Sequence, residues 1–246
     1  MINYDYINEY IRNTIKKDEG FLLELRRYAE DNHVPIVHPE VARFITVLGS
    51  ILKPSRILEV GTAIGYSSIL FSHVLAPGGI IDTIESNDVM AELARKNVRM
   101  AGCKDVINVI EGDAMDILPY LEKKYNFIFL DAAKGQYPEF FPFCFRLLNA
   151  GGILVSDNVL YKGMVANDAL VVRRKKTIVR RLREYLHDIC NNPCLETSIL
   201  PIGDGVAVSY YSGMNPDDHS TTAIIEDRSI STIFIDNKTG DDNGKN

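Results

Sequence analysis

The sequence predicts an α/β fold in which a mostly parallel sheet ends in an antiparallel hairpin and is preceded by additional N-terminal helices. Two observations predict this fold. From residue 56 onward, short apolar runs alternate with helical stretches, which is typical of strand–helix–strand crossovers in a parallel sheet. The last two apolar runs are separated only by residues 202–205, a connection too short for a parallel crossover but long enough for a hairpin.

The composition is that of a folded protein. The chain has 246 residues, of which 46% are hydrophobic and 24% charged, and this excludes a chain that is disordered throughout. No apolar run reaches the roughly 18 residues that a membrane span needs, and the first residues lack the apolar block of a secretory signal. We therefore expect a cytoplasmic protein without a membrane partner. Four scattered cysteines are expected to be reduced structural thiols.

Three helices are expected before the first strand. Apolar residues repeat at helical spacing over residues 3–17, and a second helix is expected over 21–31. A third is expected to run from Pro39, which suits a first helical turn, to Leu52. We expect one domain over residues 1–213, with helices over 1–52 and the α/β core over 53–213.

The core is expected to alternate strictly between strands and helices until the hairpin. The expected strands cover 56–60, 80–85, 106–110, 127–131 and 153–157, and the expected helices cover 67–75, 88–101, 114–121, 137–148 and 173–189. The hairpin strands are expected over 195–201 and 206–211. Residues 214–246 hold seven acidic and three basic residues, so we expect a polar acidic tail that is partly disordered, in which 231–236 also fits a strand.

The strongest local feature is a glycine-containing turn after the first expected strand, with the sequence Glu59-Val60-Gly61-Thr62-Ala63-Ile64-Gly65-Tyr66-Ser67-Ser68. Glycines allow a sharp turn close to a ligand, and the helix that follows offers free N–H groups. The turn lacks the close pair of glycines with which the dinucleotide motif G-x-G-x-x-G holds a pyrophosphate, which disfavours a nicotinamide dehydrogenase. Glu59 suits a ligand with a cationic amino group. The alternative is an ordinary strand–helix turn.

Two further acidic residues end the next two expected strands. Glu85 follows Glu59 by 26 residues, and a carboxylate there accepts hydrogen bonds from both hydroxyls of a ribose. Asp113, in Gly112-Asp113-Ala114, ends the third strand and is placed to accept from an adenine amino group. Each alone would more often be a capping or loop acid. Together the three acids lie at the sheet edge where open α/β sheets bind ligands.

This arrangement resembles the class I S-adenosylmethionine-dependent methyltransferases, whose Rossmann-like sheet also ends in an antiparallel hairpin. The motifs at 131–137 and 156–160, together with Gly203-Asp204-Gly205, look like those of the cation-dependent O-methyltransferases of catechol and caffeoyl-CoA type. The similarity covers residues 30–211 and implies S-adenosylmethionine as the cofactor. The cofactor-binding residues expected on this basis are His38, Glu59, Gly61, Thr62, Gly65, Ser67, Ser68, Glu85, Gly112, Asp113, Ala114 and Asp131.

The same resemblance implies a metal site and a base. Asp131, Asp157 and Asn158 offer three oxygen donors, which suit Mg²⁺, or another divalent cation such as Ca²⁺ or Mn²⁺, better than zinc. Asp131 and Lys134 match the family's catalytic positions, where Lys134 would accept the proton of the substrate hydroxyl. The alternatives are an ordinary strand-end turn at Asp157-Asn158 and an exposed, salt-bridged Lys134.

The expected substrate follows from one difference between this sequence and the motif of the plant caffeoyl-CoA enzymes. Plant caffeoyl-CoA enzymes usually carry Asp-Ala-Asp-Lys, whereas this chain has Ala133 in place of the second aspartate. The sequences at 132–137 and 157–163 resemble the bacterial branch that methylates 5-hydroxyuridine in tRNA. The resemblance therefore implies formation of 5-methoxyuridine at the wobble position, since the 5-hydroxyl and 4-carbonyl oxygens form a chelating pair similar to a catechol. A catechol or caffeoyl-CoA type of small-molecule substrate is the alternative.

A basic segment supports the tRNA expectation. Residues 160–187 have eight basic and two acidic residues, in a chain with a net charge of −6. Phosphate contacts need only positive charge around the pocket, and an anticodon-loop base enters without duplex melting. The expected tRNA contacts are Arg173, Arg174, Lys175, Arg180 and Arg181; the alternative is a solvated helix face. The resemblance also suggests that the N-terminal helices cover the cofactor cleft and contribute to a homodimer. A non-catalytic RNA-binding module is disfavoured by the intact set of metal and base residues.

Overall fold

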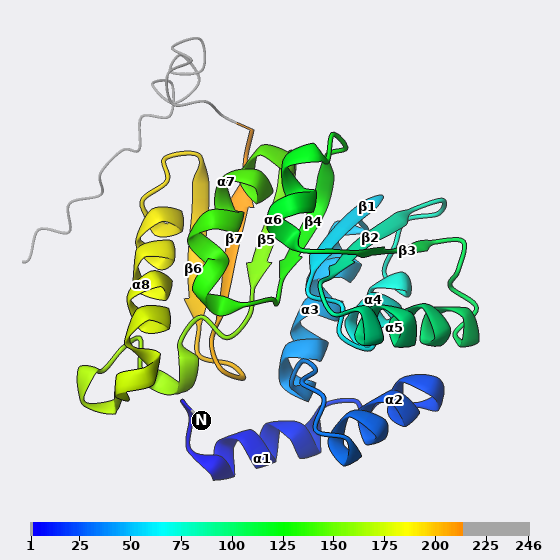
Figure 1. Cartoon of the computed structure of the whole chain (residues 1–246). Coiled ribbons are helices and arrows are strands. Elements are labelled where there is room, and N and C mark those ends of the chain that lie inside the picture. The colour runs from blue at the N-terminus through cyan, green and yellow to red at the C-terminus, as the bar shows by residue number, and fades with distance from the viewer. Residues whose placement is uncertain (1, 214–246) are drawn as a thin grey trace, which may run out of the picture. The chain divides into compact units, whose positions relative to one another are not determined.

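The computed structural model describes residues 2–213 (Figure 1). The tail expected over 214–246, including 231–236, lies outside the described residues. Three helices precede the sheet, as the sequence predicted: α1 (Asp5–Thr14), α2 (Gly20–Asp31) and α3 (Pro39–Leu52). Pro39 occupies the first turn of α3, and Lys53 ends that helix in the left-handed conformation. None of the helices in the described part is long and apolar enough to cross a bilayer.

Seven strands form one sheet in the order β3-β2-β1-β4-β5-β7-β6. The strands are β1 (Arg56–Val60), β2 (Ile80–Glu85), β3 (Ile107–Glu111), β4 (Tyr125–Leu130), β5 (Leu148–Ser156), β6 (Leu195–Leu200) and β7 (Val206–Tyr211). The first five strands pair in parallel, whereas β7 is antiparallel to both β5 and β6. The predicted parallel sheet with a closing antiparallel hairpin is therefore confirmed.

Five α-helices connect the strands. They are α4 (Tyr66–Ser72), α5 (Asp88–Met100), α6 (Ala114–Ile117), α7 (Tyr137–Leu147) and α8 (Lys176–Cys190). Short 3-10 turns cover Leu118–Tyr120, Lys134–Gln136, Tyr161–Gly163, Asp168–Leu170 and Arg173–Lys175.

The structure corrects several expected boundaries. The helix expected over 67–75 ends at Ser72, and the strand expected over 127–131 is β4, Tyr125–Leu130. The fifth strand begins at Leu148 instead of 153, since Leu148 already pairs with Tyr125 before the register shifts. The helix expected over 114–121 is a short α6 followed by a 3-10 turn, in which Pro119 has no N–H to continue the α-helical pattern. The helix expected from residue 173 is α-helical only from Lys176, after a 3-10 turn.

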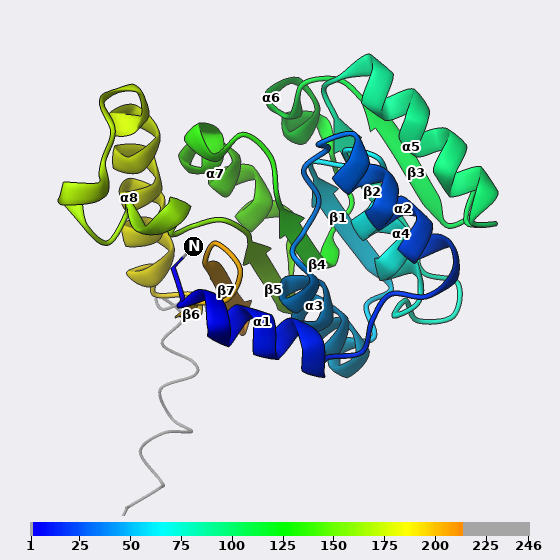
Figure 2. The ribbon, with the colours of Figure 1, turned by 90° about the horizontal axis from the view of Figure 1, so that it is seen from below.

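The sheet carries one hydrophobic core on each face. Along β4, Phe127 and Phe129 belong to the core under α3 and α4, where both rings contact Phe71 edge-on. Ile128 and Leu130 belong to the opposite core, under α7 and α8. In Figure 2 these two groups of helices lie on either side of the strands. The alternation is the two-residue period of a strand that is buried on both faces.

The register of the parallel strands sets the level of the residues that follow them. Val60 pairs with both Ile84 and Leu130, and Leu130 pairs with Ser156. The chain therefore leaves β1, β2, β4 and β5 at the same height, on the carboxyl edge of the sheet. This edge is where the predicted chemistry-bearing residues were expected to meet.

A buried ion-pair network joins two of the N-terminal helices to α4, the helix that follows β1. The carboxylate of Asp18, between α1 and α2, is only 5% exposed and pairs with Arg26 at 2.6 Å and Arg43 at 2.7 Å. It also accepts a hydrogen bond from the Tyr66 hydroxyl at 2.6 Å. Burial by itself would raise the pKa of Asp18, but the hydrogen bonds and charges of these partners hold it below its usual value. One carboxylate thereby joins α2, α3 and α4.

Candidate active site

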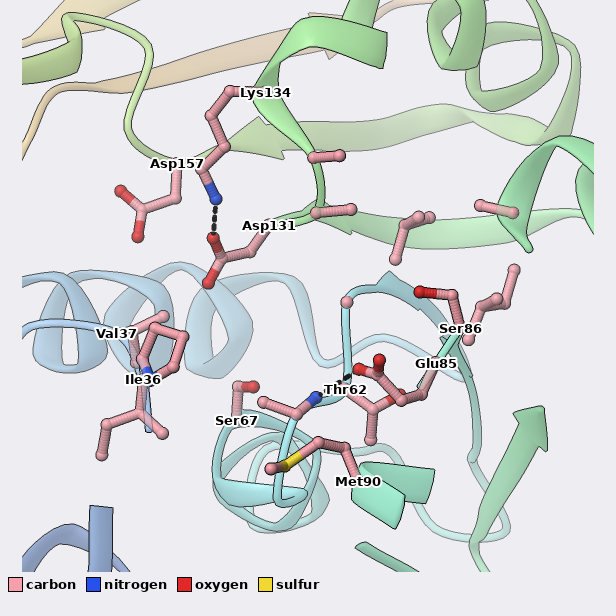
Figure 3. Close-up of a pocket in the computed structure, with 18 of the residues that line it drawn as sticks. Ile36, Val37, Thr62, Ser67, Glu85, Ser86, Met90, Asp131, Lys134 and Asp157 are labelled. Atoms are coloured by element: carbon pink, nitrogen blue, oxygen red, sulfur yellow. Dashed lines mark hydrogen bonds and ion pairs between the residues drawn. The ribbon is translucent and has the colours of Figure 1, made fainter. Parts of the chain in front are cut away.

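A cavity of about 660 Å³ opens at the carboxyl edge of the sheet (Figure 3). The loops after β1, β2, β3, β4 and β5 line it, together with the segment 32–38 between α2 and α3. A volume of this size suits a cofactor-sized ligand. The predicted site residues that line it are His38, Gly61, Thr62, Ser67, Glu85, Gly112, Asp113, Ala114, Asp131, Lys134, Asp157 and Asn158.

The glycine-containing turn is held against its neighbouring strands. The N–H groups of Gly61 and Thr62 donate to the carbonyl of Ile84 at 2.9 and 3.2 Å. Gly61 has a φ of +106°, and any Cβ at this position would collide with the carbonyl oxygen of Asp131. Glycine is therefore required here by the backbone of the adjacent strand end as well as by its own conformation. Gly65, the N-cap of α4, does not line the cavity.

Glu85 lies on the wall with its carboxylate fixed by the backbone. One oxygen accepts the N–H of Ala63 at 2.8 Å and the other the N–H of Asn87 at 2.9 Å. A carboxylate held in this way keeps free lone pairs for ligand hydroxyls. Asp113 caps α6 by accepting the N–H of Met115 at 2.8 Å, so its carboxylate has a structural role as well as a place on the wall.

Glu59 and Ser68 lie behind the wall instead of on it. Glu59 is fully buried and accepts hydrogen bonds from the hydroxyls of Ser68 and Thr83, while its other oxygen has no partner among the described residues. Burial raises the pKa of Glu59 to about 7, against hydrogen bonds from Ser67, Ser68 and Thr83. Ser67, beside Ser68 on α4, lines the cavity, whereas Glu59 does not.

At the other end of the cavity, Lys134 lies between two carboxylates (Figure 3). Its Nζ donates to Asp131 at 2.5 Å. Asp157 is 1% exposed, and burial followed by the charge of Asp131 raises its pKa, against the opposing charge of Lys134. The hydroxyl of Tyr137 contacts the carbonyls of Leu130 and Asp157 at 2.9 and 3.0 Å, and so ties the ends of β4 and β5 together.

The donor set at this end fits a hard divalent cation. Within residues 2–213 no group of three His, Cys, Asp or Glu side chains gathers around one point, so the predicted set has two carboxylates and the Asn158 amide. All three donors are oxygens, as Mg²⁺, Ca²⁺ and Mn²⁺ prefer. Burial, and after it the charge of Asp131, raises the pKa of Asp157, because two carboxylates are crowded together away from water. A bound cation would relieve that crowding, and three protein ligands leave coordination positions for other oxygens.

Sequence reasoning missed several residues that line the cavity, most of them in the connection between α2 and α3. The segment 32–37 lines the cavity, as do Ser86, Met90, Gln136 and Phe140. Most of these residues carry no reactive group, so only their position marks them. The segment 32–37 is held by Arg26, which donates to the carbonyl of Val37 at 3.3 Å. A proline-containing connection between two helices was the sole signal in the sequence.

The predicted tRNA-binding residues separate into two groups. Arg180 pairs with Glu184 at 2.5 Å, and Arg181 is half-buried against Glu139, so both have partners within the fold. Arg173 and Arg174 are exposed and form no ion pair with any residue in the described part of the chain. Lys175 lies 5.5 Å from the ring centre of Tyr161. Free positive charge is thus concentrated in the 3-10 turn before α8.

Comparisons with known proteins identify the family. Residues 12–210 match the family model described as O-methyltransferase. A catechol O-methyltransferase from Niastella koreensis is 29% identical over 217 residues, which cover 86% of this chain and 95% of that protein. The crystal structure of a candidate caffeoyl-CoA O-methyltransferase from Staphylococcus aureus is similar with a TM-score of 0.78 and 33% identity, covering 84% of this chain and all of that one.

The cofactor is indicated by a second solved structure. An O-methyltransferase from Bacillus cereus, in complex with SAH, is similar with a TM-score of 0.75 and 26% identity, over 86% of this chain and 100% of that one. Its ligand is the one that the cavity at the carboxyl edge, with Glu85 on its wall, would be expected to hold. The chain therefore belongs to the O-methyltransferase family and is an S-adenosylmethionine-dependent O-methyltransferase.

Proposed function

We propose that this enzyme methylates the 5-hydroxyl of 5-hydroxyuridine at the wobble position of tRNA. The observation that carries the proposal is the free positive charge beside the end of the cavity that holds Lys134 and Asp157. We call this the acceptor end. Arg173 and Arg174 lie in the turn that leads into α8, and α8 packs against the turn Lys134–Gln136. A Cβ at Gly135 in that turn would lie 3.7 Å from Ile178 of α8. Phosphates on either side of a bound base would meet this charge.

The residues at the acceptor end have separate tasks in this proposal. S-adenosylmethionine supplies an electrophilic methyl group, and Glu85 would hold its ribose. Asp131, Asp157 and Asn158 would hold a divalent cation, which supplies Lewis acidity toward an acidic hydroxyl. In its neutral form Lys134 accepts the hydroxyl proton at Nζ, and Asp131 then stabilises the ammonium ion across 2.5 Å. The cavity walls keep donor and acceptor in line and exclude water.

A second candidate is a small-molecule substrate of the catechol type. The relative from Niastella koreensis is named a catechol O-methyltransferase, and a catechol presents the same pair of neighbouring oxygens as the 5-hydroxyl and 4-carbonyl of 5-hydroxyuridine. Free catechol has no phosphates, so it gives Arg173 and Arg174 no function, and this difference separates it from tRNA by experiment. A caffeoyl-CoA ester does carry phosphates, so it is separated from tRNA by nucleoside mass spectrometry of the product and not by the loss of these charges.

The test reverses the free charges and compares two substrates. In the variant Arg173→Glu/Arg174→Glu, the KM for an anticodon stem-loop that carries 5-hydroxyuridine should rise at least tenfold, because phosphate contacts are lost. Each lost contact should also flatten the slope of log affinity against log salt by roughly 0.7 to 0.9. Methylation of free catechol should be unchanged. Transfer of a labelled methyl group, followed by nucleoside mass spectrometry, measures both reactions.

A matched control makes the same change of charge elsewhere. Lys104 and Lys123 are exposed and precede β3 and β4, at the amino edge of the sheet opposite the cavity. The variant Lys104→Glu/Lys123→Glu should therefore methylate the stem-loop as the wild-type enzyme does. Equal loss in both variants, or an unchanged salt slope in the Arg173/Arg174 variant, would contradict the tRNA proposal and favour the small-molecule substrate.

A further inference from the structure

The cavity has two chemically different ends, and the His38 ring belongs to one of them. Glu85 and Met90 mark one end, and Lys134 and Asp157 mark the other (Figure 3). The Cδ2 edge of His38 faces the hairpin turn between β6 and β7, where a Cβ at Gly203 would lie 3.4 Å away. The same turn is hydrogen-bonded to the loop that follows Asp157 and Asn158, since the N–H of Val159 donates to the carbonyl of Gly205 at 2.9 Å and that of Leu160 to the carbonyl of Asp204 at 3.1 Å. We therefore assign the ring to the acceptor end, and not to the cofactor-binding residues among which the sequence had placed His38.

Arg12 fixes the proton of His38. The guanidinium of Arg12 approaches Nδ1 of His38 to 3.3 Å. Arginine has donors only, so Nδ1 must accept, and the neutral ring then carries its proton on Nε2. Burial lowers the pKa of His38, and the charges of Arg12 and Arg26 lower it further against those of Glu40 and Asp204. The ring is therefore neutral near pH 7.

Arg12 is itself held rigidly. It donates two hydrogen bonds of 2.8 Å to the carboxylate of Glu40, whose side chain is 5% exposed. Arg12 comes from α1 and Glu40 from the first turn of α3, so two helices determine how the ring is held. By contrast, Nε2 has no hydrogen-bond partner among residues 2–213. The ring lines the cavity with one donor unused.

We propose that His38 is a specificity-determining residue, which donates its Nε2–H to a carbonyl oxygen of the methyl-acceptor ring. The inference rests on the proposed function and deepens it. A 5-hydroxyuridine ring carries carbonyl oxygens, whereas a catechol carries none. The His38 donor thus favours a hydroxyl-bearing ring with a carbonyl acceptor over a simple diphenol, which offers this half-buried N–H no carbonyl oxygen.

The test compares three variants on two substrates. His38→Phe keeps a planar ring but removes the donor, so the KM for the 5-hydroxyuridine stem-loop should rise about tenfold with kcat changed less than twofold. His38→Gln restores a donor and should recover at least half of that loss on a logarithmic scale. His73→Phe makes the same change at an exposed position and should behave as the wild-type enzyme. Catechol methylation should be equal in all four proteins.

Cofactor binding separates a specific role from a damaged pocket. Calorimetric affinity for S-adenosylhomocysteine should be the same within twofold in all four proteins. An unchanged KM for the stem-loop in His38→Phe, or an equal rise with catechol, overturns the inference alone, since wild-type turnover of the stem-loop still supports the proposed function. A wild-type enzyme that methylates catechol but not the stem-loop overturns both.

Discussion

At the scale of single residues, burial decides what an acidic side chain at a strand end does. Glu59 and Glu85 come from neighbouring strands of the same sheet. Glu85 lies on the cavity wall, and its two oxygens accept backbone N–H groups. Glu59 is fully buried, keeps one oxygen without a partner in the described part of the chain and has a pKa raised to about 7. The same residue type thus provides a ligand-facing carboxylate in one case and a titrating group inside the wall in the other.

The raised pKa of Glu59 predicts a pH-dependent cost to stability. Below pH 4.5 the carboxyl is protonated in both the folded and the unfolded chain; between pH 4.5 and 7 the folded chain retains a proton that the unfolded chain has lost. Wild-type stability therefore falls through this range as pH rises. Relative to the wild type, the isosteric variant Glu59→Gln should gain up to about 3 kcal/mol between pH 4.5 and pH 7. Urea denaturation at a series of pH values measures the difference.

Glu111→Gln provides the control for this prediction. Glu111 is exposed on β3 and pairs with Arg95 across the surface, so its replacement should change stability by less than about 0.5 kcal/mol at any pH in the range. A difference between Glu59→Gln and the wild type that stays constant from pH 4.5 to 7 would show that Glu59 ionises normally.

Much of the site was predictable at this scale, because residues at the ends of parallel strands meet at one edge. Asp131, Lys134, Asp157 and Asn158 all line the cavity, as the sequence predicted. Whether a given residue faces the ligand or lies one layer behind it was not predictable. The motif at 59–68 shows this. Gly61 and Ser67 line the cavity, whereas Glu59, Gly65 and Ser68 of the same motif do not.

At the scale of elements, the predictions held where the hydrophobic period was clear and failed where polar or proline residues continued an element. The strands β1, β2 and β7 have the bounds that the sequence predicted. The first residues of β5 are Leu-Asn-Ala-Gly-Gly, which carry no alternation, and their pairing depends on β4. Likewise, no local pattern showed that the connection from α2 to α3 forms a wall of the cavity.

The ion-pair network around Asp18 should therefore matter to both stability and cofactor binding. Asp18→Asn leaves Arg26 and Arg43 without their carboxylate in a mostly buried place, so the variant should lose about 3 kcal/mol of stability. Because Arg26 also holds the carbonyl of Val37 on the cavity wall, affinity for S-adenosylhomocysteine should fall several-fold. Denaturation and calorimetry measure the two effects.

The neighbouring acid Glu19 is the matched control. Its side chain is 76% exposed, and among residues 2–213 its one ion-pair partner is Lys16, at 3.8 Å. Glu19→Gln should leave both stability and cofactor affinity within experimental error of the wild type. If Asp18→Asn lost stability while cofactor affinity stayed unchanged, the link from the network to the cavity wall would be wrong.

At the scale of the whole molecule, the parallel sheet brings negatively charged side chains together at one edge. The free energy of unfolding should therefore depend on the concentration of divalent cations. Burial and the charge of Asp131 raise the pKa of Asp157, so the two carboxylates repel each other in the folded state and not in the unfolded chain. A cation that binds the folded chain but not the unfolded one raises stability by mass action. Millimolar Mg²⁺, Ca²⁺ or Mn²⁺ should therefore raise the Tm of the enzyme after treatment with a chelator, as scanning fluorimetry would show.

The response to cations should depend on the predicted ligands. Asp157→Ala should abolish the rise in Tm and most turnover while affinity for S-adenosylhomocysteine remains. Asp116→Ala removes an exposed carboxylate on α6 and should leave the rise intact. A chelator-treated enzyme with full activity and no cation-dependent change in Tm would contradict the metal assignment.

The contact between Gly61 and the Asp131 carbonyl has a consequence for precision. No side chain separates the turn after β1, which lies beside the cofactor's place, from the strand end that carries the acceptor-side acid. In the proposed site, the spacing between the methyl donor and the acceptor would therefore be set by main chain against main chain, and not by rotamers that fluctuate independently. Over the short path of an in-line displacement, such a fixed spacing narrows the spread of approach distances that the bound reactants sample. The register of two adjacent strands thus limits how far the distance between the methyl donor and the acceptor varies.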